Sequence, residues 1–504
     1  MDKKEIRVNP GARTLRVDGR DTLLTGLSLH GFFRNLPLCA GIGRCGNCRL
    51  RFISNTPAAT SRDRESLEPA DIDRGFRLAC EHRPRTGQEI EIPSRPPVRV
   101  FSPVTSGRPE SLVVDIGTTT VKWAYDFGAG EVDLGSAPNP QSGTGGEVMS
   151  RMQFALQGPE RAEAQQEALL CLVQEILDLA TCLPRVTVFT GNPAMLCLAL
   201  GYDCSPLARS PYSLPFSGDF WFSPKPGLPE VYIPPLVSPF IGADIVCGLL
   251  ETGLCDQKGP WLFADFGTNA EMVLGTEKGC FGTSVAMGPA LEGCGLRFGA
   301  PAGQKGVCTK IALSSRGIYP QGTGKCTHLS ATAYLDLVRR LKGLGVIRSD
   351  GRFSEGLGSP LANRVRSQIR KRRLYLNEAI YLDPADIEEL LKVKAAFSLG
   401  LDSLLKTAGI PAAGLEKVCI AGALGERLSP AVLTGLGFLP PASEEKINFC
   451  GNTSLSGGLK LAADLDRGRL EAHKIRGRVQ TVDLTQTRFY TGKEFARHMR
   501  FESV

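Results

Sequence analysis

The chain has 504 residues and a formal net charge of +7, and this length is typical of about three domains. Hydrophobic residues make up 42% and charged residues 22% of the sequence, which excludes a disordered or collagen-like chain. No stretch of about 18 residues is free of charged or strongly polar side chains, and no apolar run follows the first charges. We therefore expect no membrane span, no signal peptide and a cytoplasmic location. Sixteen cysteines in such a protein favour metal binding or burial over a disulfide framework.

The positive charge is concentrated near the N-terminus. Residues 1–100 contain 18 Lys and Arg residues against 12 Asp and Glu residues, whereas the remainder is almost neutral. The basic residues form no dense run and show little aromatic interleaving, so the pattern does not favour nucleic-acid binding. We interpret it as a weakly basic docking face for an acidic protein partner.

The first part of the chain, residues 4–92, is predicted to be a small β-rich unit. Asp21 is expected to cap a short leucine-rich helix. A proline-rich stretch between residues 93 and 109 then predicts a stiff, extended linker. Alternating apolar residues predict strands at residues 5–8, 14–17, 49–53 and 89–92.

Beyond the linker, strands alternate with amphipathic helices, which is typical of α/β proteins. The clearest helices are predicted at residues 161–182 and 386–406. Residues 112–120 and 262–269 repeat one pattern, an apolar strand followed by an Asp-x-Gly-Thr turn, and a second apolar strand follows each copy. Two copies at a domain-sized separation predict two related lobes.

Four cysteines form the most specific motif of the N-terminal part. Five residues lie between the first and second, two between the second and third, and 31 between the third and fourth. Such a spacing favours an iron–sulfur cluster, and the intervening glycines would let the loop wrap around it. A four-cysteine zinc site usually has two close pairs along the chain, and it remains an alternative, as do free thiols. The predicted ligands are Cys39, Cys45, Cys48 and Cys80.

With these ligands, residues 4–92 resemble a β-grasp 2Fe–2S ferredoxin of the subgroup whose first cysteine gap is five residues. The segment Leu78 to Cys80 matches the part of that family that holds the fourth ligand.

The two aspartate turns are typical of a phosphate-binding hairpin. Glycine permits close approach of the backbone, threonine hydroxyls and turn N–H groups donate hydrogen bonds, and the carboxylate can bind Mg²⁺. A single such turn is most often only a hairpin, but two copies after apolar strands favour a nucleotide site. We assign Asp115 and Asp265 as the catalytic carboxylates.

This pattern resembles the superfamily of sugar kinases, actin and chaperone ATPases, in which two ribonuclease-H-like lobes close over ATP. The segment 418–425 matches the strand-to-glycine segment near adenosine, although it could be an ordinary strand–helix turn. Glu147 lies where the superfamily commonly has an acid that orients water or a hydroxyl; a helix-capping or solvent-facing glutamate is the alternative. The resemblance implies that ATP with Mg²⁺ is bound by Gly117, Thr118, Thr119, Gly267, Thr268, Asn269, Gly422 and Gly425.

The combination of the two halves resembles the reductive activators of corrinoid proteins. That resemblance implies ATP-dependent transfer of one electron from the 2Fe–2S cluster to Co(II), which restores Co(I) for methyl transfer. It also implies a corrinoid protein of a methyltransferase system and an upstream reductant as partners, and a possible homodimer. Family members usually have a Gly-Ile-Cys-Gly-Ser-Gly segment near the nucleotide, whereas residues 324–329 read Gly-Lys-Cys-Thr-His-Leu, and they carry Asp where Glu147 stands.

The predicted fold is therefore an α+β ferredoxin-like β-grasp domain followed by a two-lobed α/β ATPase domain. We expect the first domain at residues 1–93, the linker at 94–110 and the ATPase domain at 111–504. Three other functions remain open: an ATP-gated electron donor to another low-potential enzyme, a redox-sensing binding module with a degenerate ATPase fold, and a small-molecule kinase.

Overall fold

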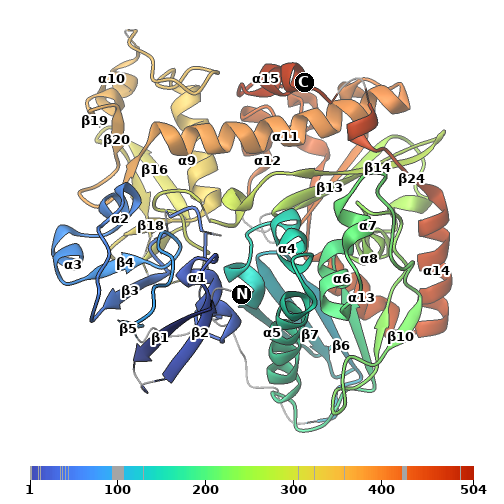
Figure 1. The fold of residues 1–504 in the computed structure, drawn as a ribbon. Coiled ribbons are helices and arrows are strands. Elements are labelled where there is room, and N and C mark those ends of the chain that lie inside the picture. The colour runs from blue at the N-terminus through green and yellow to red at the C-terminus, as the bar shows by residue number, and fades with distance from the viewer. Residues whose placement is uncertain are drawn as a thin grey trace. The chain divides into compact units, whose positions relative to one another are not determined.

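The structure, a computed structural model, is shown in Figure 1. The residues that it describes are 3–9, 11, 13–34, 36, 38–39, 41–43, 45–93, 107–128, 130–293, 295–302, 304, 306–322, 324–356, 358–422, 428–487 and 490–503. The linker that the prolines predict falls largely outside these ranges, and the domain boundaries expected from the sequence stay a prediction.

The chain divides into two compact units, which are described separately. The first comprises residues 1–187, 194–215 and 221–231, and the second comprises residues 188–193, 216–220 and 232–504. Within the described part of the chain, no helix combines the length and the apolar character needed to cross a membrane.

The N-terminal region is a five-stranded sheet with the strand order β2-β1-β5-β3-β4, drawn in blue in Figure 1. Strand β1 pairs antiparallel with β2 and parallel with β5, and the apolar residues that alternate along β1 and β2 are buried. All four strands predicted from the sequence are confirmed, but Thr22 and not Asp21 caps the first helix. The elements are β1 (Lys3–Asn9), β2 (Arg13–Asp18), α1 (Leu23–Leu29), β3 (Arg49–Phe52), α2 (Ser61–Ser66), α3 (Pro69–Asp73), β4 (Phe76–Leu78) and β5 (Gln88–Glu91).

A six-stranded sheet follows, with the order β10-β11-β9-β6-β7-β8. Its strands β6, β7 and β8 form an antiparallel meander, and the first aspartate turn joins β6 to β7. The predicted helix at 161–182 is confirmed as α5, which ends five residues earlier. The elements are β6 (Ser111–Ile116), β7 (Thr120–Asp126), β8 (Val132–Pro138), η1 (Pro140–Gly143), α4 (Val148–Ala155), α5 (Pro159–Leu177), β9 (Val186–Thr190), α6 (Pro193–Leu200), α7 (Ser205–Ala208), β10 (Phe220–Phe222) and β11 (Val231–Ile233).

The last part of the chain repeats this meander in a second six-stranded sheet, β23-β22-β12-β13-β14-β24, where the second aspartate turn joins β12 to β13. The internal repeat in the sequence is therefore a repeat of structure. The strands of this sheet are β12 (Trp261–Phe266), β13 (Asn269–Thr276), β14 (Gly279–Ala286), β22 (Lys417–Ala421), β23 (Ile447–Gly451) and β24 (Val479–Thr481). Smaller sheets contain β15 (Val307–Cys308), β16 (Lys310–Ser314), β17 (Gly317–Gln321), β18 (His328–Leu329), β19 (Ile369–Arg370), β20 (Arg373–Tyr375) and β21 (Tyr381–Leu382).

The rest of this part of the chain is largely helical. The helix predicted at 386–406 is confirmed as α11, which is slightly longer. The α-helices are α8 (Ala243–Thr252), α9 (Ala331–Gly343), α10 (Pro360–Arg366), α11 (Pro384–Ala408), α12 (Pro430–Gly435), α13 (Thr453–Ala463), α14 (Leu465–Arg478) and α15 (Gly492–His498). Short 3-10 helices are η2 (Leu254–Asp256), η3 (Pro289–Glu292), η4 (Ala412–Gly414), η5 (Pro441–Lys446) and η6 (Leu484–Gln486).

Helix α11 carries one fully buried ammonium group. The Lys394 side chain is 1% exposed, and its Nζ donates to the carbonyl oxygen of Glu502 at 2.6 Å and to that of His498 at 3.4 Å. Burial lowers the pKa of Lys394 to about 8 because the charged form loses its hydration. The lysine therefore attaches the C-terminal segment to α11 at a cost in desolvation.

We predict that the free energy of unfolding of the wild type, measured relative to Lys394→Met, rises with pH between about 8 and 10.5. In that interval the folded chain has released the proton and the unfolded chain still binds it. The rise is at most about 3 kcal/mol, and urea titrations at about pH 7 and about pH 10 measure it. A difference that stays constant over this range would contradict the prediction.

Candidate functional site: a thiol cluster and two aspartate turns

Strand pairing brings the third and fourth cysteines together. Cys48 directly precedes β3, and one residue separates Cys80 from the end of β4. The register pairs Arg49 of β3 with Leu78 of β4. The two Sγ atoms lie 3.4 Å apart, and Ala79 N donates to the carbonyl oxygen of Cys48 at 3.0 Å. An antiparallel strand pair thus positions two thiols that are distant in sequence.

The four thiols are arranged as two interacting pairs. Cys48 interacts with Cys80, and Cys45 interacts with Cys39. The partner thiol and then burial raise the pKa of Cys45 and that of Cys48 well above the ordinary value. Each iron of a two-iron cluster takes two cysteine thiolates, so two pairs of thiols fit such a cluster. Among the described residues, no group of three or more His, Cys, Asp or Glu side chains is arranged to hold a metal ion.

The loop around these thiols turns tightly at three glycines. Gly41, Gly43 and Gly46 all have positive φ angles, of 83°, 78° and 66°, which other residues adopt only with strain. The Asn47 N–H donates to Cys45 Sγ at 3.3 Å, which is the kind of N–H to sulfur hydrogen bond that stabilises a negatively charged cluster.

A buried carboxylate fixes the segment that carries the fourth cysteine. Asp63 is fully buried, and it accepts hydrogen bonds from the Leu78 N–H at 2.8 Å and from Thr60 N at 2.8 Å. His82 Nε2 lies 2.7 Å from the same carboxylate. Burial raises the pKa of Asp63, but these hydrogen bonds outweigh it and lower the pKa overall.

The first aspartate turn is a tight loop between β6 and β7. A Cβ added at Gly117 would overlap the carbonyl oxygen of Thr120, so only glycine fits there. Asn139 fixes the loop from outside: its Nδ2 donates to the Gly117 carbonyl oxygen and its N–H donates to the Thr119 carbonyl oxygen, both at 2.8 Å. Thr118 is buried, whereas Asp115 is partly exposed. Two hydrogen bonds from the buried Asn139 therefore hold the predicted residues of this turn in place.

The second aspartate turn is supported in a similar way by the segment after β14. Met287 N donates to the Thr268 carbonyl oxygen at 3.0 Å, and the Thr268 hydroxyl donates to Glu292 Oε1 at 2.6 Å. Within the turn, Gly267 N donates to the carbonyl oxygen of Asn269 at 2.9 Å.

Two further features bring polar and backbone groups close to Asp265. Glu271 lies opposite it in the strand register and accepts from the Ser284 hydroxyl at 3.0 Å. Burial and the charge of Asp265 raise the pKa of Glu271 to about 8, so Glu271 holds a proton near neutral pH. Gly422 has a φ of 92°, and a Cβ there would lie 2.7 Å from Asp265 Oδ1. The predicted glycine segment thus reaches the second aspartate, while Gly425 lies outside the described residues.

Glu147 occupies the capping position that the sequence left open as an alternative. It is the N-cap of α4, where its carboxylate accepts from Ser150 N at 3.3 Å and the Ser150 hydroxyl completes a capping box. The structure thus gives this side chain a structural contact, and a catalytic role for it stays a prediction.

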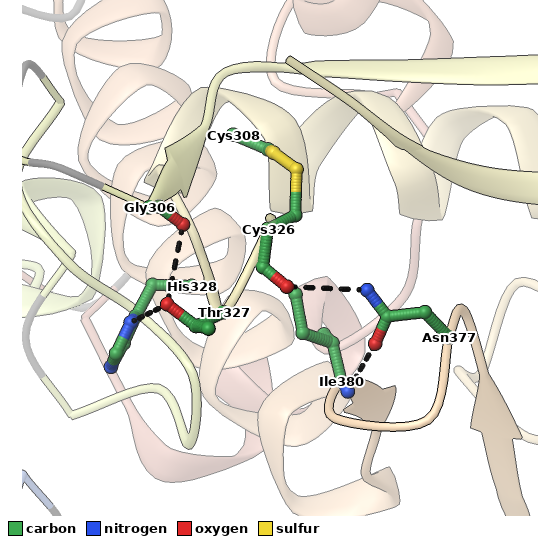
Figure 2. Close-up of a disulfide and its surroundings, with 7 residues drawn as sticks. All are labelled: Gly306, Cys308, Cys326, Thr327, His328, Asn377 and Ile380. Atoms are coloured by element: carbon green, nitrogen blue, oxygen red, sulfur yellow. Dashed lines mark hydrogen bonds between the residues drawn. A yellow bond between two sulfur atoms is a disulfide. The ribbon is translucent and has the colours of Figure 1, made fainter. Parts of the chain in front are cut away.

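The stretch that lacks the expected glycines contains a disulfide. Cys326 is joined to Cys308, with the two Cα atoms 5.8 Å apart, and Asn377 Nδ2 donates to the Cys326 carbonyl oxygen at 3.3 Å (Figure 2). The sequence favours metal binding or burial over a disulfide framework, and this pair is an exception to that expectation. Because its sulfur is bonded to Cys308, Cys326 does not offer a thiolate to a metal ion, and the neighbouring His328 Nδ1 contacts the Thr327 hydroxyl.

Two residues that matter for these turns were not predicted from the sequence. Asn139 follows β8 and precedes a proline, a pattern that indicates only a turn. Glu292 lies 24 residues after Thr268, and a lone glutamate at that spacing matches no motif. Only the folded chain reveals that each residue supports an aspartate turn.

Fold and site together define a class of protein: a ferredoxin-like region joined to an ASKHA fold, the fold of actin and the sugar kinases. A family model for the RACo middle region matches residues 111–257. A model for the C-terminal domain of RACo, the ASKHA domain, matches residues 260–503. The chain therefore belongs to the RACo family, and the predicted fold class is confirmed.

Individual relatives agree with this family. RamQ of Eubacterium limosum, named a corrinoid activation enzyme, is 29% identical over 376 residues, which are 69% of this chain and 63% of that protein. A Methanosarcina barkeri protein named Co(II) methylated amine-specific corrinoid protein reductase is 28% identical over 253 residues, which are 48% of this chain and 46% of that protein. The chain thus spans less than two thirds of either relative's length.

A solved structure of a reductive activator for corrinoid,iron-sulfur protein has the same fold. It matches with a TM-score of 0.69 at 22% sequence identity, over 99% of this chain and 98% of that chain.

We predict that Cys45→Ser abolishes the visible and EPR signals of the cluster, because one thiolate ligand is lost. Cys182→Ser is the matched control, since Cys182 is an exposed free thiol, and it should leave both signals intact. Iron and acid-labile sulfide are measured on the same anaerobic samples. An unchanged spectrum in Cys45→Ser, or zinc in place of iron in the wild type, would refute the ligand assignment.

Proposed function

We propose that this chain is an ATP-dependent reductase that reactivates a corrinoid protein. Its substrate is a corrinoid whose cobalt has been oxidised to Co(II), and the product is the Co(I) form that accepts methyl groups. The observation that supports this most strongly is the presence of two thiol pairs and two aspartate turns in one chain of the RACo family. The names of two relatives, a corrinoid activation enzyme and a corrinoid protein reductase, support the same substrate class.

The cluster that we propose for the thiols is of the 2Fe–2S type. When bound, such a cluster carries one electron, and plant-type clusters have reduction potentials of about −400 mV. The chain's own contribution is to hold two largely buried thiol pairs and to donate the Asn47 N–H to the Cys45 sulfur, and both features would tune the potential through charge and solvent exclusion.

The aspartate turns are proposed to bind ATP with Mg²⁺. Asp115 and Asp265 would provide carboxylate oxygens, and turn N–H groups and the hydroxyls of the first turn would donate to phosphate oxygens; the Thr268 hydroxyl would first have to give up its hydrogen bond to Glu292. The proposed phosphate ligands are Gly117, Thr118, Thr119, Gly267, Thr268 and Asn269, and Gly422 allows the backbone to approach closely.

ATP would contribute to electron transfer through a change of conformation. For one electron, each 59 mV of unfavourable potential costs a factor of ten in the equilibrium constant. A nucleotide can offset this cost only if it binds one conformation of the protein–corrinoid complex more tightly than another. We therefore expect hydrolysis to depend on the corrinoid protein. The upstream reductant is a further proposed partner.

We predict that ATP hydrolysis by the wild type is stimulated by a Co(II) corrinoid protein and that Asp265→Ala removes this stimulation with the cluster spectrum intact. Asp256→Ala is the matched control in the same unit, because Asp256 is exposed and forms a surface ion pair with Arg478. Steady-state phosphate release under anaerobic conditions measures the effect. Hydrolysis that never responds to a corrinoid protein would favour a small-molecule kinase, and the absence of nucleotide binding would favour a sensor.

A further inference from the structure

An ion pair and a close backbone contact join the ferredoxin-like region to the lobe of the first aspartate turn. All residues of this contact belong to the first compact unit. Arg161, near the start of α5, donates from Nη1 and Nη2 to the two carboxylate oxygens of Asp21, at 3.1 and 3.0 Å. Its Nη2 also lies 3.3 Å from Asp18. The side chains of Arg161, Asp18 and Asp21 are only 12–13% exposed, so solvent screens these ion pairs less than pairs on an open surface.

The neighbouring helix α1 contacts the 3-10 helix η1 beside this ion pair. The Thr25 hydroxyl donates to the Gly143 carbonyl oxygen at 3.2 Å. A Cβ added at Gly143 would overlap the Ser28 side chain, so glycine is required for the two segments to approach this closely. The contact therefore combines a two-carboxylate ion pair with close packing.

Helix η1 connects this contact to the first aspartate turn. One end is Gly143, which touches α1, and the other end is capped by Asn139, whose side chain and N–H hold the carbonyl oxygens of Gly117 and Thr119. Asn139 is 1% exposed. Gln141 of η1 also donates to the carbonyl oxygen of Gln165 at 3.1 Å, which fixes η1 to the helix that carries Arg161. A displacement of α1 therefore acts on the turn through a short, fully packed segment.

We propose that this contact is the docking site of the cluster-bearing region on its own ATPase lobe and that η1 couples docking to nucleotide binding. The inference rests on the proposed binding of ATP by the first turn. In the docked state η1 is packed on both sides, so Asn139 holds the turn in the arrangement seen here. When the region undocks, η1 loses the support of α1, and the turn binds nucleotide more weakly.

By linkage, nucleotide binding then favours the docked state to the same extent. The chain would thus hold its electron carrier against the lobe while nucleotide is bound and release it when nucleotide leaves. This coupling lies within the chain and needs no change at the thiols themselves.

The test compares three proteins: the wild type, the single variant Arg161→Ala, and a double variant that carries both Arg161→Glu and Asp21→Arg and so swaps the two charges. Hydrogen exchange is measured first, without nucleotide, on peptides from residues 18–29 and 139–144. We expect faster exchange in Arg161→Ala and recovery in the charge swap. Arg185→Ala is the control, because Arg185 forms an exposed pair with Glu110 in the same unit. Unchanged exchange in Arg161→Ala would overturn the docking site.

The affinity for a non-hydrolysable ATP analogue is then measured by calorimetry on the same proteins. We expect Arg161→Ala to raise the Kd by about fivefold or more, with recovery in the charge swap and no change in Arg185→Ala. Faster exchange with an unchanged Kd would overturn the coupling. If the wild type binds no analogue, the proposed function fails instead, and the hydrogen-exchange result still decides whether the docking site exists.

Discussion

The electron-carrier half of the protein depends on how the fold pairs thiols from two separate segments of the chain. Cys48 and Cys80 are 32 residues apart in sequence, and the antiparallel register of β3 and β4 brings their sulfur atoms to 3.4 Å. Three glycines with positive φ angles let the loop before β3 turn tightly, and Cys45 and Cys39 form the second pair. Backbone geometry thus assembles the thiol cluster, and Asp63 fixes the segment that carries its last member.

The two aspartate turns share a design but differ in their electrostatic surroundings. In the first, Asp115 lies opposite Lys122 in the strand register, whereas in the second Asp265 lies opposite Glu271. The residue across the strand pair from the aspartate is thus basic in the first turn and acidic in the second.

Much of this architecture was predictable from sequence because its signals are local. Alternating strands, the helix at α5 and the repeated Asp-x-Gly-Thr turns depend on residues that are close together in the chain. The supports of the site were not predictable, since Asn139 and Glu292 act across the fold and neither has a motif. The cap at Thr22 and the pairing of Cys308 with Cys326 likewise depend on backbone geometry that composition does not reveal.

The central claim is that nucleotide and electron carrier act together in one polypeptide. The most direct measurement is a single-turnover experiment in which the pre-reduced protein is mixed anaerobically with a Co(II) corrinoid protein and Co(I) formation is followed by absorbance. The account predicts that the amount of Co(I) rises when ATP and Mg²⁺ are present and does not exceed one equivalent per chain. The same amount of Co(I) with and without ATP would contradict it.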